Sequence, residues 1–381
     1  MIYFDHAATT MPKPQAVTDA VIEAMKEYGN PSRGAYEASL KGLRCMLQAR
    51  VALAGMFGVP DPMWVAFTMN ATAALNIAIA GIRGHIVTTA AEHNSVLRPV
   101  CRRGDYSIVP LDPLGRLDLT VAEQFIRPDT EAMVMTHASN LTGNVYDIRA
   151  AGELCRQKGI KLIVDAAQTA GLLPLDMVGD GISALCFSGH KSLYGPQGTG
   201  GICLNADQYQ PLPLVIGGSG SESFSPEHPQ VLPDALEAGT QNAHGIAGLL
   251  AGIEYVNSLE GRGFDEADGH ARRFIEGVRR LPGVVLYGDL DACLRTPVVA
   301  LNIGGRDSSE VADKLNEHYG IAVRAGAHCA PLMHETLGTV MSGAVRFSFS
   351  HYNTAEEVDL AIRAVKELNG GEGGMGYADE D

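Results

Sequence analysis

The amino-acid sequence predicts an α/β protein, with a large domain built on a mostly parallel sheet and a smaller α+β domain. Short apolar segments alternate with helical patterns from about residue 16 to 204, which is typical of strands buried on both faces of a parallel sheet. A stretch rich in proline and glycine, 205–240, then separates this part from a second set of strands and helices. The length of 381 residues also favours more than one domain.

The elements of the large domain are predicted in order along the chain. Apolar residues at helical spacing predict helices at 40–57, 71–80 and 148–158. Apolar runs predict strands at 64–67, 85–89, 131–136, 161–164 and 184–187. We place this domain at residues 15–245.

The smaller domain is predicted to combine residues 1–14 with 246–368. Its expected strands lie at 283–287, 297–303, 321–324 and 344–349, and its expected helices at 265–280, 307–318 and 354–368, after a connecting helix at 245–258. Thr354 and Glu357 have the spacing of a capping box at the start of the last helix. Residues 369–381 are rich in glycine and acidic side chains and are predicted to form a flexible acidic tail.

Composition and charge argue against several classes of protein. The formal charge of −15 disfavours non-specific binding to nucleic acid or to an anionic membrane surface. No apolar run approaches the roughly 18 residues of a membrane span, and we expect no signal peptide. The seven cysteines include no Cys-x-x-Cys pair, so we expect no metal site, and their scatter fits reduced thiols in the cytoplasm.

Two polar groups follow neighbouring buried strands of the large domain. Asp165 comes directly after 161–164, and Lys191 follows 184–187 at the start of a glycine-rich turn. Taken alone, Lys191 fits an exposed loop lysine and Asp165 fits a helix cap. The carboxyl ends of parallel strands form ligand sites, and an amine with a carboxylate is what pyridoxal phosphate requires for a Schiff base and a protonated ring nitrogen.

Other polar residues follow strands in the same way. The segment 68–76 opens a helix whose free N–H groups and Thr72 hydroxyl suit an anion, although an ordinary polar N-cap explains it equally well. His93 offers a flat ring that can stack on a cofactor, or it is a loop histidine with satisfied hydrogen bonds. Asn140 offers an amide for a phenolate oxygen, or it is a turn residue.

The smaller domain holds a candidate nucleophile and a candidate anion-binding residue. Cys329 lies beside His328 in a glycine-containing loop, a setting in which a thiolate is accessible, whereas the other six cysteines fit small core residues. Arg346 lies within a strand. It belongs either to a solvated face or to a site that binds a substrate carboxylate through two hydrogen bonds.

Nine motifs occur together in order: DHAATT at 5–10, TMNATAALN at 68–76, AEHNS at 91–95, SNLTG at 139–143, VDAAQTAG at 164–171, SGHKSLYGPQGTGG at 188–201, EAGTQN at 237–242, RAGAHCAP at 324–331 and RFSFSHYNT at 346–354. They resemble the class V aminotransferase family of pyridoxal-phosphate enzymes, and within it the cysteine desulfurases and selenocysteine lyases of group II. The resemblance covers residues 1 to about 368. It implies the fold type I of pyridoxal-phosphate-dependent transferases.

The resemblance implies roles for the cofactor-binding residues. Lys191 would bind the cofactor covalently, Asp165 would pair with its ring nitrogen and His93 would stack on its ring. The remaining cofactor contacts would come from Asn140 and Gln168 near the phenolate oxygen, and from Ala71, Thr72, Ser188, His190 and the partner subunit's Thr240 around the phosphate. A contribution from a second subunit implies a homodimer.

The resemblance also implies an activity. L-Cysteine, bound by Arg346 and bordered by Asn30, Ala8 and His328, would become L-alanine, with a persulfide on Cys329 for an unidentified acceptor protein. L-Selenocysteine as substrate, a class V reaction that does not use Cys329, and a sulfur-relay protein without turnover are the alternatives. The chain departs from the family pattern at Ala71, at Ala73 and at Ala327, where group II members often have histidine.

Overall fold

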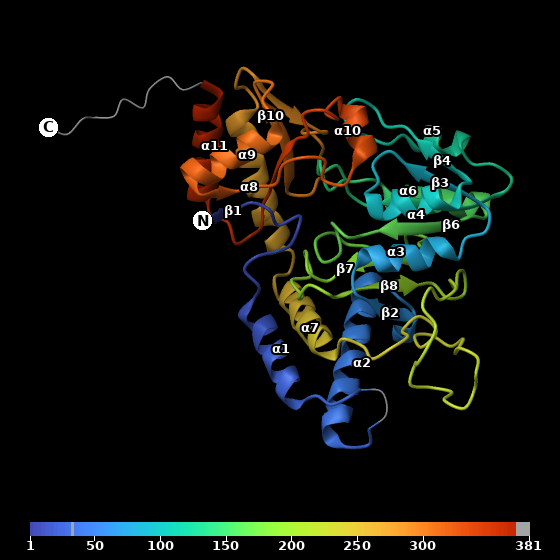
Figure 1. Ribbon diagram of the computed structural model, residues 1–381. Helices are drawn as coiled ribbons and strands as arrows, with labels where there is room; N and C mark the ends of the chain where they lie inside the picture. Colours follow the sequence, from blue (N-terminus) through green and yellow to red (C-terminus); the bar gives the residue numbers. More distant parts are fainter. Residues whose placement is uncertain (32–33, 371–381) are drawn as a thin grey trace.

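The computed structural model describes residues 1–31 and 34–370 in two units that lie side by side (Figure 1). The first unit is built on a sheet of seven strands in the order β2 (Val65–Thr68), β8 (Gly200–Leu204), β7 (Ala184–Ser188), β6 (Lys161–Asp165), β5 (Thr130–Thr136), β3 (His85–Thr89) and β4 (Tyr106–Val109). Strand β8 runs opposite to the other six strands of this sheet, which are parallel to one another. The mostly parallel sheet that the sequence predicts is therefore confirmed.

Both faces of this sheet are buried, and successive side chains of a strand point into opposite cores. Leu162 and Val164 of β6 face one core, and Ile163 between them faces the other. The first core is covered by α2 (Glu37–Phe57), α5 (Leu119–Gln124), α6 (Ile148–Lys158) and α7 (Ala243–Ser258), and the second by α3 (Ala71–Ala80) and α4 (Asn94–Arg103). Helix α1 (Gln15–Glu27) packs against α7. Because helices cover both faces of the sheet, its strands are apolar at consecutive positions rather than at every second one.

The second unit contains a three-stranded antiparallel sheet and a two-stranded parallel one. The first has the order β12 (Val345–Ser348), β10 (Val298–Ile303) and β9 (Val284–Tyr287), and the second pairs β1 (Ile2–Tyr3) with β11 (Ile321–Ala322). The helices of this unit are α8 (Arg262–Val278), α9 (Ser308–Tyr319), α10 (Pro331–Leu337) and α11 (Ala355–Gly370). The pairing of β1 with β11 fixes the first residues of the chain within the second unit.

The capping box predicted for the last helix is present. The backbone N–H of Glu357 donates to Thr354 Oγ1, and the N–H of Thr354 donates to Glu357 Oε2, each at 3.2 Å. This helix continues to Gly370, so the predicted flexible tail starts too early at residue 369. The rest of that tail, 371–381, lies outside the described residues.

Seven helices and strands of the described residues were not expected from the sequence: β1, α1, α4, β4, α5, β8 and α10. The sequence pattern placed Gly200 and Gly201 in a glycine-rich turn, but they begin β8. A Cβ at Gly201 would lie 2.8 Å from the carbonyl oxygen of Ala66 on β2. Glycine at this position permits close strand packing, a requirement that arises only in the folded sheet.

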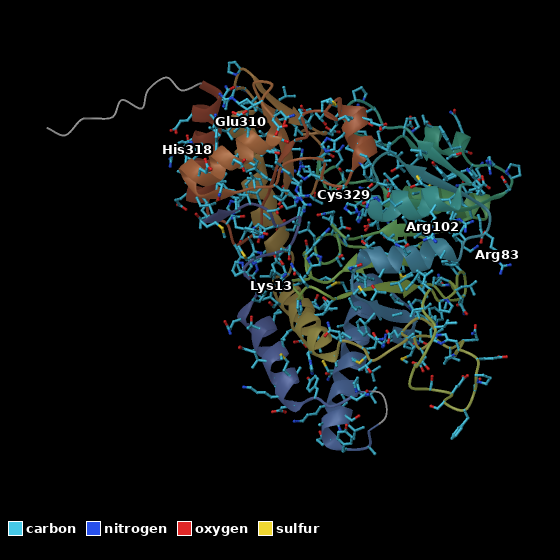
Figure 2. The ribbon with its side chains drawn as sticks, in the orientation of Figure 1. Lys13, Arg83, Arg102, Glu310, His318 and Cys329 are labelled. Carbon is cyan, nitrogen blue, oxygen red and sulfur yellow. The ribbon has the colours of Figure 1, made fainter. Side chains whose placement is uncertain are left out.

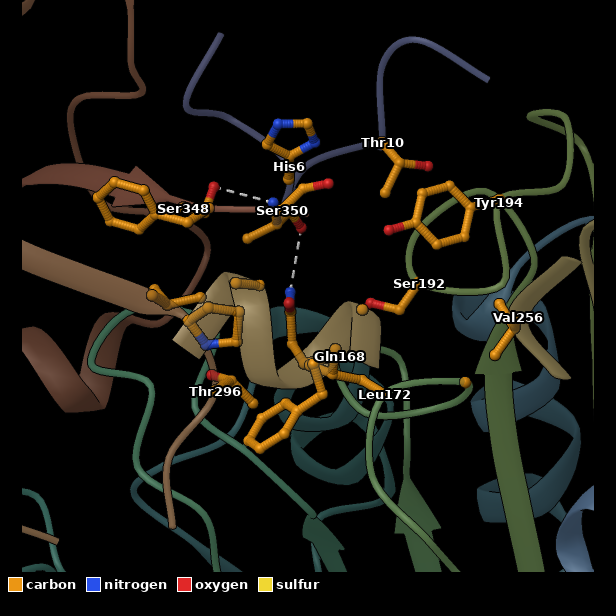
Figure 3. A pocket seen from close by; sticks show the side chains of 18 of the residues that line it. His6, Thr10, Gln168, Leu172, Ser192, Tyr194, Val256, Thr296, Ser348 and Ser350 are labelled. Carbon is orange, nitrogen blue, oxygen red and sulfur yellow. Dashed lines mark hydrogen bonds between the residues drawn. The ribbon is translucent and has the colours of Figure 1, made fainter. Parts of the chain in front are cut away.

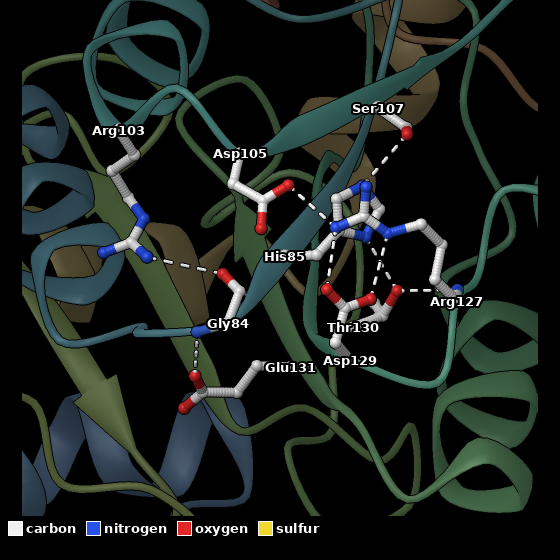
Figure 4. Close-up of polar contacts among 9 residues, drawn as sticks. All are labelled: Gly84, His85, Arg103, Asp105, Ser107, Arg127, Asp129, Thr130 and Glu131. Carbon is white, nitrogen blue, oxygen red and sulfur yellow. Dashed lines mark hydrogen bonds and ion pairs between the residues drawn. The ribbon is translucent and has the colours of Figure 1, made fainter.

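The amino-terminal edge of the same sheet carries a polar network that is remote from the strands' carboxyl ends (Figure 4). His85 bonds through Nδ1 to Thr130 Oγ1 and through Nε2 to Ser107 Oγ, at 2.7 and 2.9 Å. Arg127 pairs with Asp105 and Asp129 beside it. Each of these groups has a partner, so the network joins three strands.

No helix in the described part of the chain is both long and apolar enough to cross a membrane.

Candidate active site

The carboxyl ends of the sheet strands border a cavity of about 290 Å³. Twelve of the residues singled out from the sequence line it: Ala8, Ala71, Thr72, His93, Asn140, Asp165, Gln168, Ser188, His190, Lys191, His328 and Arg346. They come from both units and from segments far apart in the sequence. The structure therefore brings these twelve residues together around one cavity, and their roles stay predictions.

Asp165 and Lys191 lie in this cavity at the ends of adjacent strands, β6 and β7. Asp165 is buried, and its Oδ1 accepts a hydrogen bond of 2.9 Å from the backbone N–H of Ala167. Burial raises the pKa of Asp165, whereas that N–H and Lys191 favour its charged form. Burial lowers the pKa of Lys191 to about 8, so its amine loses its proton far more readily than an exposed lysine does.

His93 is fixed at the start of α4 as the N-cap. Its Nδ1 accepts from the N–H of Ser95 at 3.0 Å and lies 2.9 Å from Ser95 Oγ, which lies 2.7 Å from Thr72 Oγ1. Burial, with Lys191 and other nearby cations, lowers the pKa of His93 to about 4. The ring is therefore a neutral, oriented plane at neutral pH. The sequence analysis missed Ser95, although it stands in the same AEHNS motif.

The start of α3 offers donors for an anion. Asn70 caps the helix by accepting from the N–H of Ala73 at 2.9 Å, and Ser188 Oγ accepts from the N–H of Ala71 at 3.2 Å. The exposed Thr72 stands in the first turn, where helix N–H groups and the helix dipole favour negative charge. Of the two explanations that the sequence left open, the polar N-cap is thus present, and anion binding stays a prediction.

Two residues from the second unit join Asn140 at the opposite side of the cavity. Asn140 Nδ2 donates to the carbonyl oxygen of His328 at 2.7 Å, and Arg346 donates to the carbonyl oxygen of Asn140 at 3.0 Å. The other terminal nitrogen of Arg346 pairs with Asp5 at 2.7 Å. Arg346 is 2 % exposed, which corrects the alternative that it lies on a solvated strand face. Its Nε has no hydrogen-bond partner among the described residues.

Cys329 lies on a strained loop beside the cavity (Figure 2). His328 and Cys329 have φ angles of +48° and +57°, a left-handed backbone that costs free energy in residues other than glycine. Hydrogen bonds hold the loop in place, because the N–H of Asn94 donates to the Cys329 carbonyl at 2.7 Å. The Cys329 side chain is exposed and does not line the cavity, although the adjacent His328 does.

Two further residues predicted from the sequence lie outside the cavity. Thr240 and Asn30 are exposed and do not line this cavity. The sequence analysis in turn missed Asp5, which pairs with Arg346, and Arg324, which lines the cavity. Both stand inside motifs that it quoted, DHAATT and RAGAHCAP, so the motifs were informative although the individual side chains were not singled out.

A smaller cavity of about 70 Å³ adjoins the first one (Figure 3). Gln168 and Ala7 line both cavities, and Gln168 Nε2 donates to the carbonyl oxygen of Ala7 at 3.2 Å. Ser348 Oγ accepts from the N–H of Ala7 at 2.9 Å. The amino-terminal segment therefore forms the wall between the two spaces.

Comparisons with known proteins agree with this geometry. The family model of the class-V aminotransferases matches residues 2–360. A probable cysteine desulfurase of Methanothermobacter thermautotrophicus is 34 % identical, with 97 % of this chain and 95 % of the relative covered. A cysteine desulfurase of Klebsiella pneumoniae is 32 % identical over 97 % of this chain and 93 % of its own length.

Solved structures show the same relationship. The apo structure of a cysteine desulfurase from Thermococcus onnurineus superposes with a TM-score of 0.90 at 32 % identity, and covers 97 % of this chain and 95 % of that one. The cysteine desulfurase CsdA of Escherichia coli gives a TM-score of 0.84 at 27 % identity, with 96 % and 94 % covered. The α/β fold predicted from the sequence is confirmed, and the chain belongs to the class-V aminotransferase family.

Proposed function

We propose that this chain is a pyridoxal-phosphate-dependent cysteine desulfurase, which converts L-cysteine to L-alanine and retains the sulfur on Cys329 as a persulfide. One observation carries the proposal. Lys191 and Asp165 face one cavity, and an exposed cysteine stands on the loop beside it. The cysteine desulfurases among the similar proteins support the same reading.

The cavity residues fit pyridoxal phosphate. The start of α3 with Thr72 and Ser188 suits the phosphate, the neutral ring of His93 suits a stacked pyridine, and the buried carboxyl of Asp165 suits its ring nitrogen. When bound, this cofactor supplies an electron sink for negative charge at the substrate Cα. Lys191 is the amine that would hold it.

The lowered pKa of Lys191 also suits proton transfer. With a pKa of about 8, about a quarter of the amines are neutral at pH 7.5, against about 0.1 % for an unperturbed lysine. The neutral amine can take the Cα proton from the substrate, and Asp165 is the carboxylate that would keep the ring nitrogen of the bound cofactor protonated. Arg346 is placed to bind the substrate carboxylate, because its buried Nε is unpartnered among the described residues.

Cys329 then performs the sulfur transfer. Its thiolate attacks the substrate sulfur, so an S–S bond forms while the C–S bond breaks. The electron pair of the C–S bond remains with the carbon skeleton, which takes up protons and leaves as alanine. The step requires the thiol to turn from its exposed position toward the cavity, and the return brings the persulfide within reach of an acceptor protein.

The proposal includes a homodimer and a cytoplasmic location. Apolar side chains on one part of the surface support a second copy of the chain: Ile22 and Met25 of α1, and Leu43, Leu47 and Val51 of α2, are each at least 45 % exposed. The exposed Thr240 can then reach the partner's cavity. Reduced thiols fit the seven free cysteines.

Product analysis tests the proposal. The purified protein is incubated with L-cysteine or L-selenocysteine and a reductant, and alanine is quantified beside Cys329→Ala and Cys293→Ala variants. We expect alanine from cysteine with the wild type and with Cys293→Ala, but not with Cys329→Ala. Alanine from selenocysteine alone would instead define a selenocysteine lyase, and a yellow protein that gives no alanine would indicate another class V reaction.

A further inference from the structure

The amino-terminal segment 9–13 contacts the backbone that carries Lys191. The N–H of Thr10 donates to the carbonyl oxygen of His190 at 3.2 Å, and Thr9 Oγ1 lies 3.1 Å from the same oxygen. Thr10 Oγ1 lies 3.2 Å from this oxygen and 3.0 Å from the carbonyl oxygen of Lys191. Two consecutive carbonyl groups at the reactive lysine are thus held by a segment 180 residues away in the sequence.

Lys13 adds a positive charge to this contact. Its Nζ donates to the carbonyl oxygen of His190 and to Thr10 Oγ1, each at 2.7 Å. Hydrogen bonds from an ammonium group are shorter and stronger than those between neutral groups. No acidic side chain in the described ranges forms an ion pair with Lys13. Its charge is therefore directed at the backbone before Lys191 rather than at a carboxylate.

The position of Lys13 is itself constrained. It precedes Pro14, and a residue before proline is restricted to extended backbone. Its side chain is half-buried, and burial lowers its pKa to about 8. Partial burial of an ammonium group without a counter-charge costs desolvation free energy, whereas a fully hydrated surface lysine has no such cost.

The opposite side of the Lys191 turn is anchored within the first unit. The N–H of Gly189 donates to the Thr199 carbonyl, and the N–H of Gly195 donates to the Gly189 carbonyl, both at 2.8 Å. Between these anchors, the Lys191 carbonyl also accepts from the N–H of Tyr194 at 2.9 Å, whereas the His190 carbonyl of the 190–191 peptide plane accepts from the 9–13 segment. Rotation of that plane would turn the Cα–Cβ bond of Lys191 and move its amine within the cavity.

We propose that Lys13 is a positioning residue that fixes the 190–191 peptide plane, so that the Lys191 amine is presented to the aldehyde of pyridoxal phosphate. The inference rests on the proposed function, because it concerns the binding of that cofactor by Lys191. Lys13 acts through the backbone and touches no reacting atom. The same segment also orients His190, whose Nδ1 lies 3.1 Å from Thr9 Oγ1.

The test measures cofactor loading rather than turnover. The full-length protein is stripped of cofactor, and the rate at which the yellow complex forms with pyridoxal phosphate, and separately with pyridoxal, is followed by absorbance. We expect Lys13→Met to load both at least tenfold more slowly than the wild type, Lys13→Arg to recover most of the rate, and Lys26→Met, which changes an exposed lysine of α1, to load normally.

The outcomes separate this inference from its alternatives. Normal loading of Lys13→Met overturns it, and so does a defect with pyridoxal phosphate alone, which would mean that Lys13 only attracts the phosphate. If Lys13→Met does not fold, slow loading of Thr10→Val with normal loading of Thr10→Ser supports the inference, and equal rates for the two overturn it. A wild type that never turns yellow would remove both this inference and the proposed function.

Discussion

The two side chains to which the proposed function assigns the chemistry, Lys191 and Cys329, lie in opposite surroundings. Lys191 follows a central strand and faces a cavity in which burial lowers its pKa to about 8. Cys329 is exposed on a loop where two consecutive residues have left-handed backbone. Proton transfer benefits from a fixed and partly dehydrated amine, whereas sulfur transfer to another protein requires an accessible thiol. We call the cavity that holds Lys191 the rigid half of the site, and the loop that carries Cys329 the exposed half.

The two halves are joined by a few hydrogen bonds between the units. Asn140 Nδ2 donates to the His328 carbonyl, and the N–H of Asn94 donates to the Cys329 carbonyl, both at 2.7 Å. One bond starts from the segment after β5 and the other from the first residue of α4, and both end on the backbone of the cysteine loop. The thiol can consequently turn while the loop that carries it remains attached to the cavity.

The largest expected effect is at the rigid half. Lys191→Ala should abolish the yellow complex and lower alanine formation by about 10³-fold or more, because the cofactor loses its covalent anchor and the substrate loses its base. Absorbance and alanine are measured on the same samples, with Lys26→Ala as the control. Undiminished alanine from Lys191→Ala would contradict the assignment.

The second effect separates the exposed half from the rigid half. Cys329→Ala should lose at least about 10³-fold in alanine formation from cysteine while it keeps the visible spectrum, because the thiol is outside the cofactor cavity. Cys293→Ala alters another exposed cysteine of the same unit and should leave both readouts unchanged. A Cys329→Ala protein that binds the cofactor poorly would show that the two halves are not separable.

The third prediction concerns the group that lies between the halves. Arg346→Lys keeps the charge but loses the planar set of donors, so kcat/KM for cysteine should fall by about 2 kcal/mol, or roughly 30-fold, mainly through KM. Arg273→Lys changes an exposed arginine that pairs with Asp359 and serves as the matched control. Steady-state kinetics with cysteine measure the KM of both variants. An unchanged KM for Arg346→Lys would contradict a role of Arg346 in substrate binding.

A smaller effect is expected at the phosphate end of the rigid half. Thr72→Val removes the hydroxyl that lies 2.7 Å from Ser95 Oγ, and the dissociation constant of pyridoxal phosphate should rise by about fivefold, or about 1 kcal/mol. Thr72→Ser retains the hydroxyl and should bind as the wild type does. Equal affinities of the two variants in an equilibrium titration would exclude a role for this hydroxyl.

The smallest effect concerns pH and the exposed half. Burial lowers the pKa of His328 to about 3, so the unfolded chain binds a proton on this residue below pH 6.5 that the folded protein does not bind. The unfolding free energy therefore falls as the pH decreases from 7 to 5.5, and His328 accounts for about 1 kcal/mol of that fall. His328→Asn, which tolerates left-handed backbone, should remove this part. Denaturant unfolding at the two pH values measures it, and an unchanged slope would contradict the prediction.

The sequence by itself determined where the candidate residues stand relative to the predicted strands. Asp165 ends β6 and Lys191 follows β7 by three residues, and the carboxyl ends of parallel strands meet at one edge of the sheet, so the strand pattern was sufficient to place the two residues near each other. The same holds for His93 and Thr72, which stand at helix starts. Cys329 was singled out by its polar, glycine-containing loop. The expectation that the other six cysteines are core residues is confirmed for four of them and is wrong for Cys101 and Cys293, which are exposed.

The tertiary structure decided how these residues are used. The pairing of Arg346 with Asp5 joins residues 341 positions apart, and no local periodicity encodes such a contact. The same applies to the bond from Asn140 to the His328 carbonyl and to the position of Cys329 outside the cavity. Side-chain type and strand pattern are local properties, whereas burial, ion pairing and the pKa of each group depend on which distant segments pack around it.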